Sequence, residues 1–129
     1  MKILLLGPDG QVGWELRRAL APLGELHCLG RQSVDGNLCG DLSQPEALVK
    51  AVRTLRPDIV VNAAAHTAVD KAESEPALAH AVNAESPGRL AEVMAELGGW
   101  LVHYSTDYVF DGSGHLPRDE TAVTSPLNT

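Results

Sequence analysis

Three glycines at three-residue spacing, Gly7, Gly10 and Gly13, follow directly on a short apolar run over residues 3–6. A helical pattern of apolar residues begins before the last of them, which places the glycines in a turn between a buried strand and a helix. In such a turn the first glycine permits the tight bend, the second leaves room for a pyrophosphate, and the third lets the helix pack closely on the sheet. The spacing therefore predicts a dinucleotide-binding turn at a helix N-terminus, with an ordinary tight turn as the alternative.

The residues after the second predicted strand bear on which nicotinamide cofactor such a turn would serve. An acidic residue there binds the ribose 2′-hydroxyl of NADH, whereas an arginine accommodates the 2′-phosphate of NADPH. This sequence has Gly30 and Arg31, with no carboxylate at the strand end. Two interpretations stay open: Arg31 contacts a 2′-phosphate and favours NADPH over NADH, or it is a solvated loop arginine.

Two further loops carry candidate ligand contacts. Asp41 and Leu42 precede a predicted helix and could place a carboxylate near an adenine amino group, with a turn residue as the alternative for Asp41. Residues 62–67 follow a buried strand with small side chains, which let a ligand approach the backbone. His66 in this loop is either a site residue or an ordinary loop histidine, and none of the five histidines shows a metal-binding spacing.

A polar cluster ends the last predicted strand. Tyr104, Ser105, Thr106 and Tyr108 supply four hydroxyls, and Asp107 adds a carboxylate. A buried strand end this polar is costly unless partners or a ligand satisfy it. The cluster therefore predicts a ligand site, and capping of the loop backbone by these side chains is the alternative.

Alternating strands and helices must position these loops. Residues 43–46 have the pattern of a capping box with Pro45 in the first helical turn, and Pro76 and Pro87 are each expected to break a helical stretch. Residues 30–42 and the chain from Ser105 onward are predicted to be loops. The predicted strands cover residues 3–6, 25–29, 59–61 and 100–104, and the predicted helices cover 12–23, 45–57 and, with breaks, 71–97.

This alternation predicts a doubly wound parallel α/β sheet of about four strands with right-handed crossovers and flanking helices. Ligands of such sheets bind at the carboxyl ends of the strands. The loops over residues 7–13, 30–42, 62–70 and 105–111 all follow predicted strands, so they are expected to gather at that edge.

Composition narrows the class of protein. The chain has 129 residues, 44% of them hydrophobic, which suits a single globular domain. A net charge of −7 weighs against a nucleic-acid partner or an anionic membrane surface. Only four apolar residues precede Gly7, too few for a signal peptide or a membrane span, and Cys28 and Cys39 show neither metal-ligand nor redox spacing. We therefore expect a cytoplasmic protein with reduced thiols.

Three segments together resemble the dTDP-4-dehydrorhamnose reductases, which are extended short-chain dehydrogenases with a Rossmann-like fold. The matching segments are residues 7–16, 61–73 and 105–112, and the resemblance covers the whole chain. It implies NAD(P)H-dependent reduction of the C4 keto group of dTDP-4-dehydro-L-rhamnose to dTDP-L-rhamnose, a precursor of bacterial lipopolysaccharide O-antigen and other surface polysaccharides. A homodimer is implied for the full-length form.

The resemblance also implies roles by position. Thr106 would be the hydroxyl of the catalytic set and, with Asp107, a substrate contact. Glu15 matches a glutamate that in some members helps hold Mg²⁺ at a dimer contact, although pairing with Arg18 on the helix surface is the alternative. The implied dinucleotide contacts are Gly10, Gln11 and Val12 at the pyrophosphate, Asp41 and Leu42 at the adenine, and Ala65, His66, Thr67 and Tyr104 further along.

One departure concerns the end of the sequence. In this family the catalytic Tyr-x-x-x-Lys follows almost directly after a Pro-Leu-Asn stretch, here residues 126–128, and the last residue is Thr129. Residues 1–129 are therefore expected to form an incomplete NAD(P)-binding domain, without the catalytic Tyr/Lys segment or the substrate domain, and to be inactive alone. Two other readings stay open: a related nucleotide-sugar epimerase or dehydratase, and a non-catalytic NADP-binding subunit like that of methionine adenosyltransferase.

Overall fold

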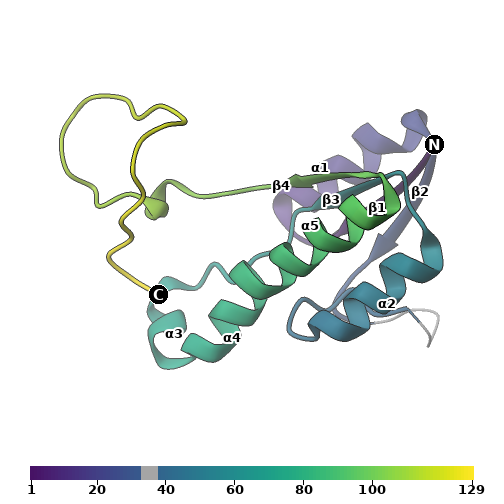
Figure 1. Cartoon of the computed structure of the whole chain (residues 1–129), viewed down its shortest axis with the longest axis horizontal. Coiled ribbons are helices and arrows are strands. Elements are labelled where there is room, and N and C mark those ends of the chain that lie inside the picture. The colour runs from purple at the N-terminus through teal and green to yellow at the C-terminus, as the bar shows by residue number, and fades with distance from the viewer. Residues whose placement is uncertain (33–37) are drawn as a thin grey trace.

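A computed structural model of the chain describes residues 1–32 and 38–129, so residues 33–37 of the predicted 30–42 loop lie outside the described residues. The strands are β1 (Lys2–Leu6), β2 (Glu25–Leu29), β3 (Ile59–Asn62) and β4 (Trp100–His103). They form one parallel sheet in the order β2-β1-β3-β4 (Figure 1). The predicted parallel α/β sheet is confirmed, and all four strands lie within one residue of the predicted bounds at each end.

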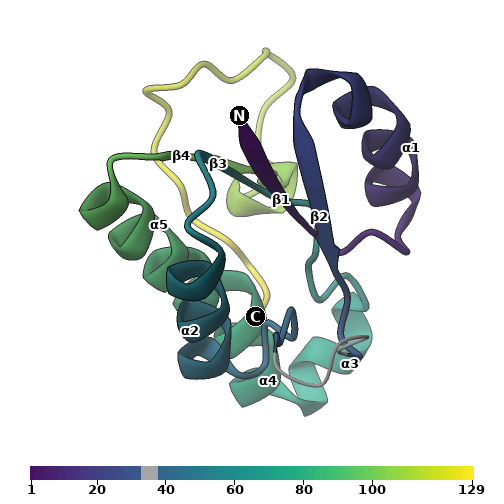
Figure 2. The same cartoon turned by 90° about the vertical axis from the view of Figure 1, so that its right-hand side faces the viewer.

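The sheet is covered on both faces, as a doubly wound fold requires. Helix α1 (Gln11–Leu20), followed by a short 3₁₀ turn (Ala21–Leu23), lies on one face. Helices α2 (Pro45–Leu55) and α5 (Ser86–Leu97) pack side by side on the other (Figure 2). Successive residues of a strand point to opposite faces, so β1 contributes to both cores.

The two cores differ in size. On the α2 and α5 face, Leu4 and Leu6 of β1 join buried residues of both helices in the larger cluster. On the α1 face, Ile3, Leu5 and Val61 form the smaller one. Continuous burial of β1 explains its run of four apolar residues.

The start and end of α2 differ from the prediction. Its N-cap is Gln44, which makes no side-chain cap, so the predicted capping box at Ser43 is wrong, while Pro45 does occupy the first turn. The Asp41 carboxylate instead accepts the Ser43 N–H at 3.0 Å, which satisfies this backbone group before the helix begins. The helix ends at Leu55, and Arg56 turns the chain with a left-handed φ of 48°.

The helical stretch between β3 and β4 is interrupted once, not twice. Helix α3 (Val69–Ser74) is followed by α4 (Pro76–His80), so the predicted break at Pro76 is confirmed. The break at Pro87 is wrong, because a π-helical turn (Ala81–Glu85) leads directly into α5. In this wider turn the Ser86 N–H donates to the Ala81 carbonyl, five residues back, and the turn accommodates the ring and missing N–H of Pro87.

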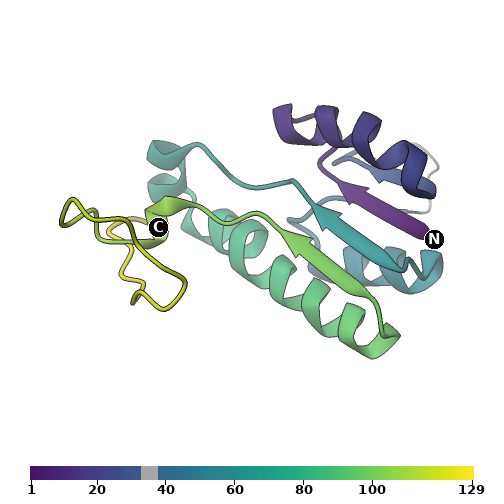
Figure 3. The ribbon, with the colours of Figure 1, turned by 90° about the horizontal axis from the view of Figure 1, so that it is seen from above.

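After β4 the chain leaves the sheet as a long loop with one short 3₁₀ turn (Asp107–Val109), as predicted (Figure 3). The loop returns toward α3, where the Thr129 N–H donates to Glu73 Oε1 at 2.8 Å. Among the helices of the described residues, none has the length and apolar character needed to cross a bilayer.

Candidate functional site

The turn between β1 and α1 is shaped by two glycines. Gly7 has a φ of +74°, and a Cβ there would lie 2.9 Å from Ala64 in the loop after β3. A Cβ on Gly13 would lie 1.9 Å from the carbonyl oxygen of Gly7, so α1 packs directly on the turn. These contacts confirm the tight bend and the close helix packing predicted for this segment.

The start of α1 has no side-chain cap. Its N-cap is Gly10, which has no side chain to cap the helix, and the first intrahelical bond runs from the Trp14 N–H to the Gly10 carbonyl. Helix geometry therefore leaves the N–H groups of residues 11–13 without intrahelical acceptors. Gln11 and Val12, two of the predicted pyrophosphate contacts, are exposed at this helix start.

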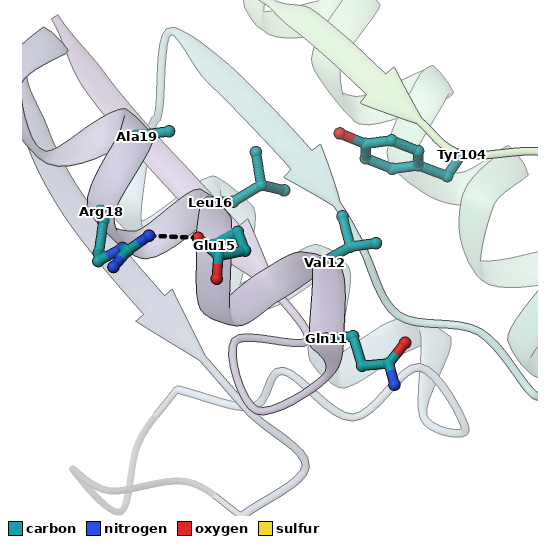
Figure 4. Close-up of a pocket in the computed structure, with 7 residues that line it drawn as sticks. All are labelled: Gln11, Val12, Glu15, Leu16, Arg18, Ala19 and Tyr104. Atoms are coloured by element: carbon teal, nitrogen blue, oxygen red, sulfur yellow. Dashed lines mark hydrogen bonds and ion pairs between the residues drawn. The ribbon is translucent and has the colours of Figure 1, made fainter.

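An open groove of about 670 Å³ runs along α1 from this point. Tyr104 projects from the end of β4 toward the helix and forms the opposite wall (Figure 4). A groove of this size could hold a small organic ligand. Its lining residues are Gln11, Val12, Glu15, Leu16, Arg18, Ala19 and Tyr104, so the structure brings Tyr104 to the same space as the helix start.

Two asparagines hold the loop after β3, and the sequence interpretation missed both as positioning residues. Asn62 is 1% exposed, and its Oδ1 accepts the Ala64 N–H at 3.1 Å. Asn83, in the π-helical turn, accepts the His66 N–H at 2.8 Å and donates to the His66 carbonyl at 3.0 Å. An asparagine inside a helical stretch is a poor helix former, which is the one local signal that Asn83 has another task.

The side chain of His66 is turned inward from the loop after β3. It is 11% exposed, and its Nε2 lies 3.8 Å from Glu75 Oε2, which Lys71 approaches to 3.4 Å. Within the described residues, the buried Nδ1 of His66 has no hydrogen-bond partner. The neighbouring Ala65 and Thr67 are exposed beside it, on the loop that Asn83 holds.

A second hydrogen bond ties this loop to β4. Because Asn62 Oδ1 faces Ala64, the Nδ2 of Asn62 donates to His103 Nδ1 at 3.1 Å, and that nitrogen must be unprotonated. Partial burial lowers the pKa of His103 below its ordinary value, in agreement with the neutral ring.

Near the carboxyl end of β2, where Gly40 lies against Leu29, Asp41 serves the turn before α2. Burial works against its ionised form, but hydrogen bonds from Ser43 and Gln44, with the positive charge of Arg31, hold the pKa of this carboxyl below its usual value. Leu42 is 4% exposed, and its carbonyl accepts the hydroxyl of the buried Ser86 at 2.6 Å. Arg31 itself is exposed, so neither of its two interpretations is excluded.

The polar cluster after β4 is exposed, which corrects the expectation of a buried strand end. β4 is one of the two edge strands of the described sheet, and Tyr104 and Tyr108 are 48% and 54% exposed. The Thr106 hydroxyl accepts the Tyr108 N–H at 3.2 Å and donates to Asp107 Oδ1 at 3.3 Å. The capping alternative is therefore present in the structure, and the catalytic role of Thr106 stays a prediction.

Glu15 forms an ion pair with Arg18 along α1 (Figure 4), which is its alternative role, and both side chains line the groove. Across residues 1–32 and 38–129, no group of three or more histidine, cysteine, aspartate or glutamate side chains is placed to hold a metal ion. The structure therefore gives no support for Mg²⁺ at Glu15.

Comparison with known proteins adds an independent finding. The family model described as the RmlD substrate binding domain matches residues 1–129. The chain is 59% identical over 128 residues to the dTDP-4-dehydrorhamnose reductase of Escherichia coli K12, and this match covers 99% of the chain and 42% of the enzyme. The chain thus spans less than half the length of this relative.

Two solved structures of similar proteins also match nearly the whole chain. A dTDP-4-dehydrorhamnose reductase from Clostridium acetobutylicum is 36% identical with a TM-score of 0.87, over 99% of this chain and 44% of that one. The Bacillus anthracis enzyme, solved in complex with NADP, is 32% identical with a TM-score of 0.84, again over 99% and 44%.

Proposed function

Because the chain belongs to the family of the RmlD substrate binding domain, we propose that it is the dinucleotide-binding part of a dTDP-4-dehydrorhamnose reductase. The observation that carries the proposal is the turn over residues 7–13, where an uncapped helix start opens onto the groove beside Tyr104. Identity of 59% to the E. coli reductase supports the same activity. The catalytic Tyr-x-x-x-Lys and the substrate domain would lie in the part of such enzymes that these 129 residues do not span.

The residues present fit a nicotinamide dinucleotide. The N–H groups at the start of α1 would bind the pyrophosphate. The glycines keep this turn tight, because a Cβ at Gly7 would clash with Ala64 and a Cβ at Gly13 would clash with the Gly7 carbonyl. The loop after β3, held by Asn62 and Asn83, would support the dinucleotide further along the groove. The B. anthracis relative was solved with NADP, which supports NADPH as the cofactor here, with NADH as the other candidate.

The bound cofactor would supply hydride to the C4 carbonyl of dTDP-4-dehydro-L-rhamnose. The Thr106 hydroxyl would then turn its proton from Asp107 Oδ1 to the oxygen at C4 as negative charge develops there. Asp107, next to it on the same exposed loop, would contact the sugar. The proton for this oxygen would come from the tyrosine of the Tyr-x-x-x-Lys motif, which residues 1–129 do not contain.

Four finer points belong to the same proposal. The product would serve the synthesis of lipopolysaccharide or another surface polysaccharide. The intact enzyme would work in the cytoplasm as a homodimer. Mg²⁺ at Glu15 would require ligands from elsewhere in that dimer, because Arg18 is its partner in this chain.

The test is an assay of the intact protein with NADPH and dTDP-4-dehydro-L-rhamnose, following oxidation at 340 nm and the sugar product by mass spectrometry. Equimolar NADP⁺ and dTDP-L-rhamnose are expected. A C4 or C5 epimer, or a dehydrated sugar, without net NADPH oxidation would instead identify an epimerase or dehydratase. Tight NADP(H) binding without any turnover would favour a non-catalytic subunit.

A further inference from the structure

The turn between β1 and α1 carries a carboxylate that faces the end of β2. A Cβ built on Gly30 would lie 3.1 Å from Asp9 Oδ2, so the carboxylate approaches bare backbone just after the strand. The two segments are neighbours because β1 and β2 pair in parallel, with Leu6 opposite Leu29. The Gly7 N–H also donates to the Leu29 carbonyl at 3.3 Å, which fixes the turn against this strand end.

This position matters for a dinucleotide. With its pyrophosphate at a helix N-terminus, the adenosine ribose of such a ligand lies beside the end of the second strand, where an acidic residue binds the 2′-hydroxyl. The strand itself supplies only Gly30 and Arg31. We propose that Asp9, in the turn between β1 and α1, binds the ribose 2′-hydroxyl in place of a carboxylate at the strand end. Asp9 would then favour NAD(H), whereas Arg31 favours NADP(H). The inference rests on the proposed function and adds a residue that sets its cofactor preference.

The charges of the two side chains give the direction. Asp9 is exposed, and no donor within residues 1–32 and 38–129 hydrogen-bonds its carboxylate, so its oxygens can accept from a ribose hydroxyl. A 2′-phosphate carries close to two negative charges at neutral pH and is repelled by a carboxylate. Arg31, one residue beyond Gly30, has the opposite effect, since a guanidinium binds phosphate and gains little from a hydroxyl.

The test measures Kd for NADP⁺ and NAD⁺ by calorimetry in the intact protein. Asp9→Asn should raise the ratio Kd(NAD⁺)/Kd(NADP⁺) about tenfold over the parent, on the scale of one charge-assisted hydrogen bond. Arg31→Ala should lower the same ratio by a similar factor, and a parent ratio above one would agree with the prediction that NADPH is preferred. The matched control is Glu120→Gln, which removes one negative charge from the C-terminal loop and should leave the ratio unchanged.

Gly30→Ala is a second, independent variant. Its φ lies outside the left-handed region, so alanine is tolerated, but the new Cβ would push the Asp9 carboxylate away. It should shift the ratio in the same direction as Asp9→Asn. If both variants keep the parent ratio within twofold while Arg31→Ala changes it, Asp9 has no part in cofactor choice. If the folded parent binds neither nucleotide, the proposed function fails first.

Discussion

The turn over residues 7–13 and the loop over residues 104–111 follow strands of one parallel sheet, yet only the turn is built into the core. The turn leaves β1, which is buried on both faces, and packs against Leu29 and Ala64. The loop leaves β4 at the sheet edge, where the side-chain hydrogen bonds of Thr106 and Asp107 stay within residues 106–108. A ligand site that rests on a central strand is preformed by packing, whereas one at an edge strand needs further partners to hold it.

The sharpest test of this difference is the 129-residue chain alone. It should bind NADPH weakly through the turn and show no measurable reductase turnover, since a proton donor is indispensable to carbonyl reduction. Neither Tyr104 nor Tyr108 is followed by a lysine four positions on, which would lower its pKa. The rate of NADPH oxidation in the presence of the dTDP-sugar measures this turnover. Turnover that disappears in Tyr108→Phe would show that the loop carries its own acid.

In the intact protein, Thr106→Val is expected to lower kcat about 100- to 1000-fold, because one donor to the developing oxyanion is lost. The Kd for NADPH should change far less, since the turn and not the loop binds the dinucleotide. Thr121→Val is the matched control, because the Thr121 hydroxyl also donates to an aspartate, Asp119, in the same C-terminal segment. An unchanged kcat would reduce Thr106 to the capping role seen in the structure.

The turn can be disturbed by one methyl group. Gly13→Ala should destabilise the fold by about 1–3 kcal/mol and weaken NADPH binding at least tenfold, because its Cβ would collide with the Gly7 carbonyl. Gly88→Ala in α5 is the control: no atom lies within 4 Å of its Cβ position, and stability should stay equal or rise. Thermal unfolding and NADPH titration measure both. Equal behaviour of the two variants would mean that α1 does not pack on the turn.

The smallest effect concerns the hydrogen bond between Asn62 and His103, which joins the end of β3 to the end of β4 just before the loop. The pKa of His103 is lowered in the folded chain, so its contribution to stability is present above the unfolded pKa and is lost as pH falls through the folded value. The melting temperature should therefore drop between pH 7.5 and 5, and the drop should shrink in His103→Gln. His115→Gln, in the exposed C-terminal loop, should keep the parent pH profile. An identical pH profile of the melting temperature in both variants would show that His103 does not contribute to this pH dependence.

Local patterns predicted the turn and the strands because both depend on neighbouring residues: four apolar residues, then glycines at a fixed spacing. The errors concern residues whose role depends on distant partners. Pro87 does not break its helix because the π-helical turn before it accommodates the ring. Ser43 does not cap α2, because Asp41 accepts the Ser43 N–H and the N-cap of the helix is Gln44.

The candidate site shows the same limit. Asn83 holds His66 from 17 residues away, and Asp9 faces Gly30 only because two strands pair. The exposure of Tyr104 follows from the edge position of β4, which depends on strand order, and no local pattern gives that order.

The open edge at β4 also affects how these 129 residues behave in solution. In the described part of the chain β4 pairs with β3 alone, and Trp100 is 75% exposed beside Val102 at 47%. An outer strand with one row of backbone groups unpaired and apolar side chains beside it can add a strand from a second molecule. Encounters of this kind grow with the square of protein concentration. Melting temperature and light scattering of the chain are therefore expected to depend on concentration, and a dilute sample reports the fold most directly.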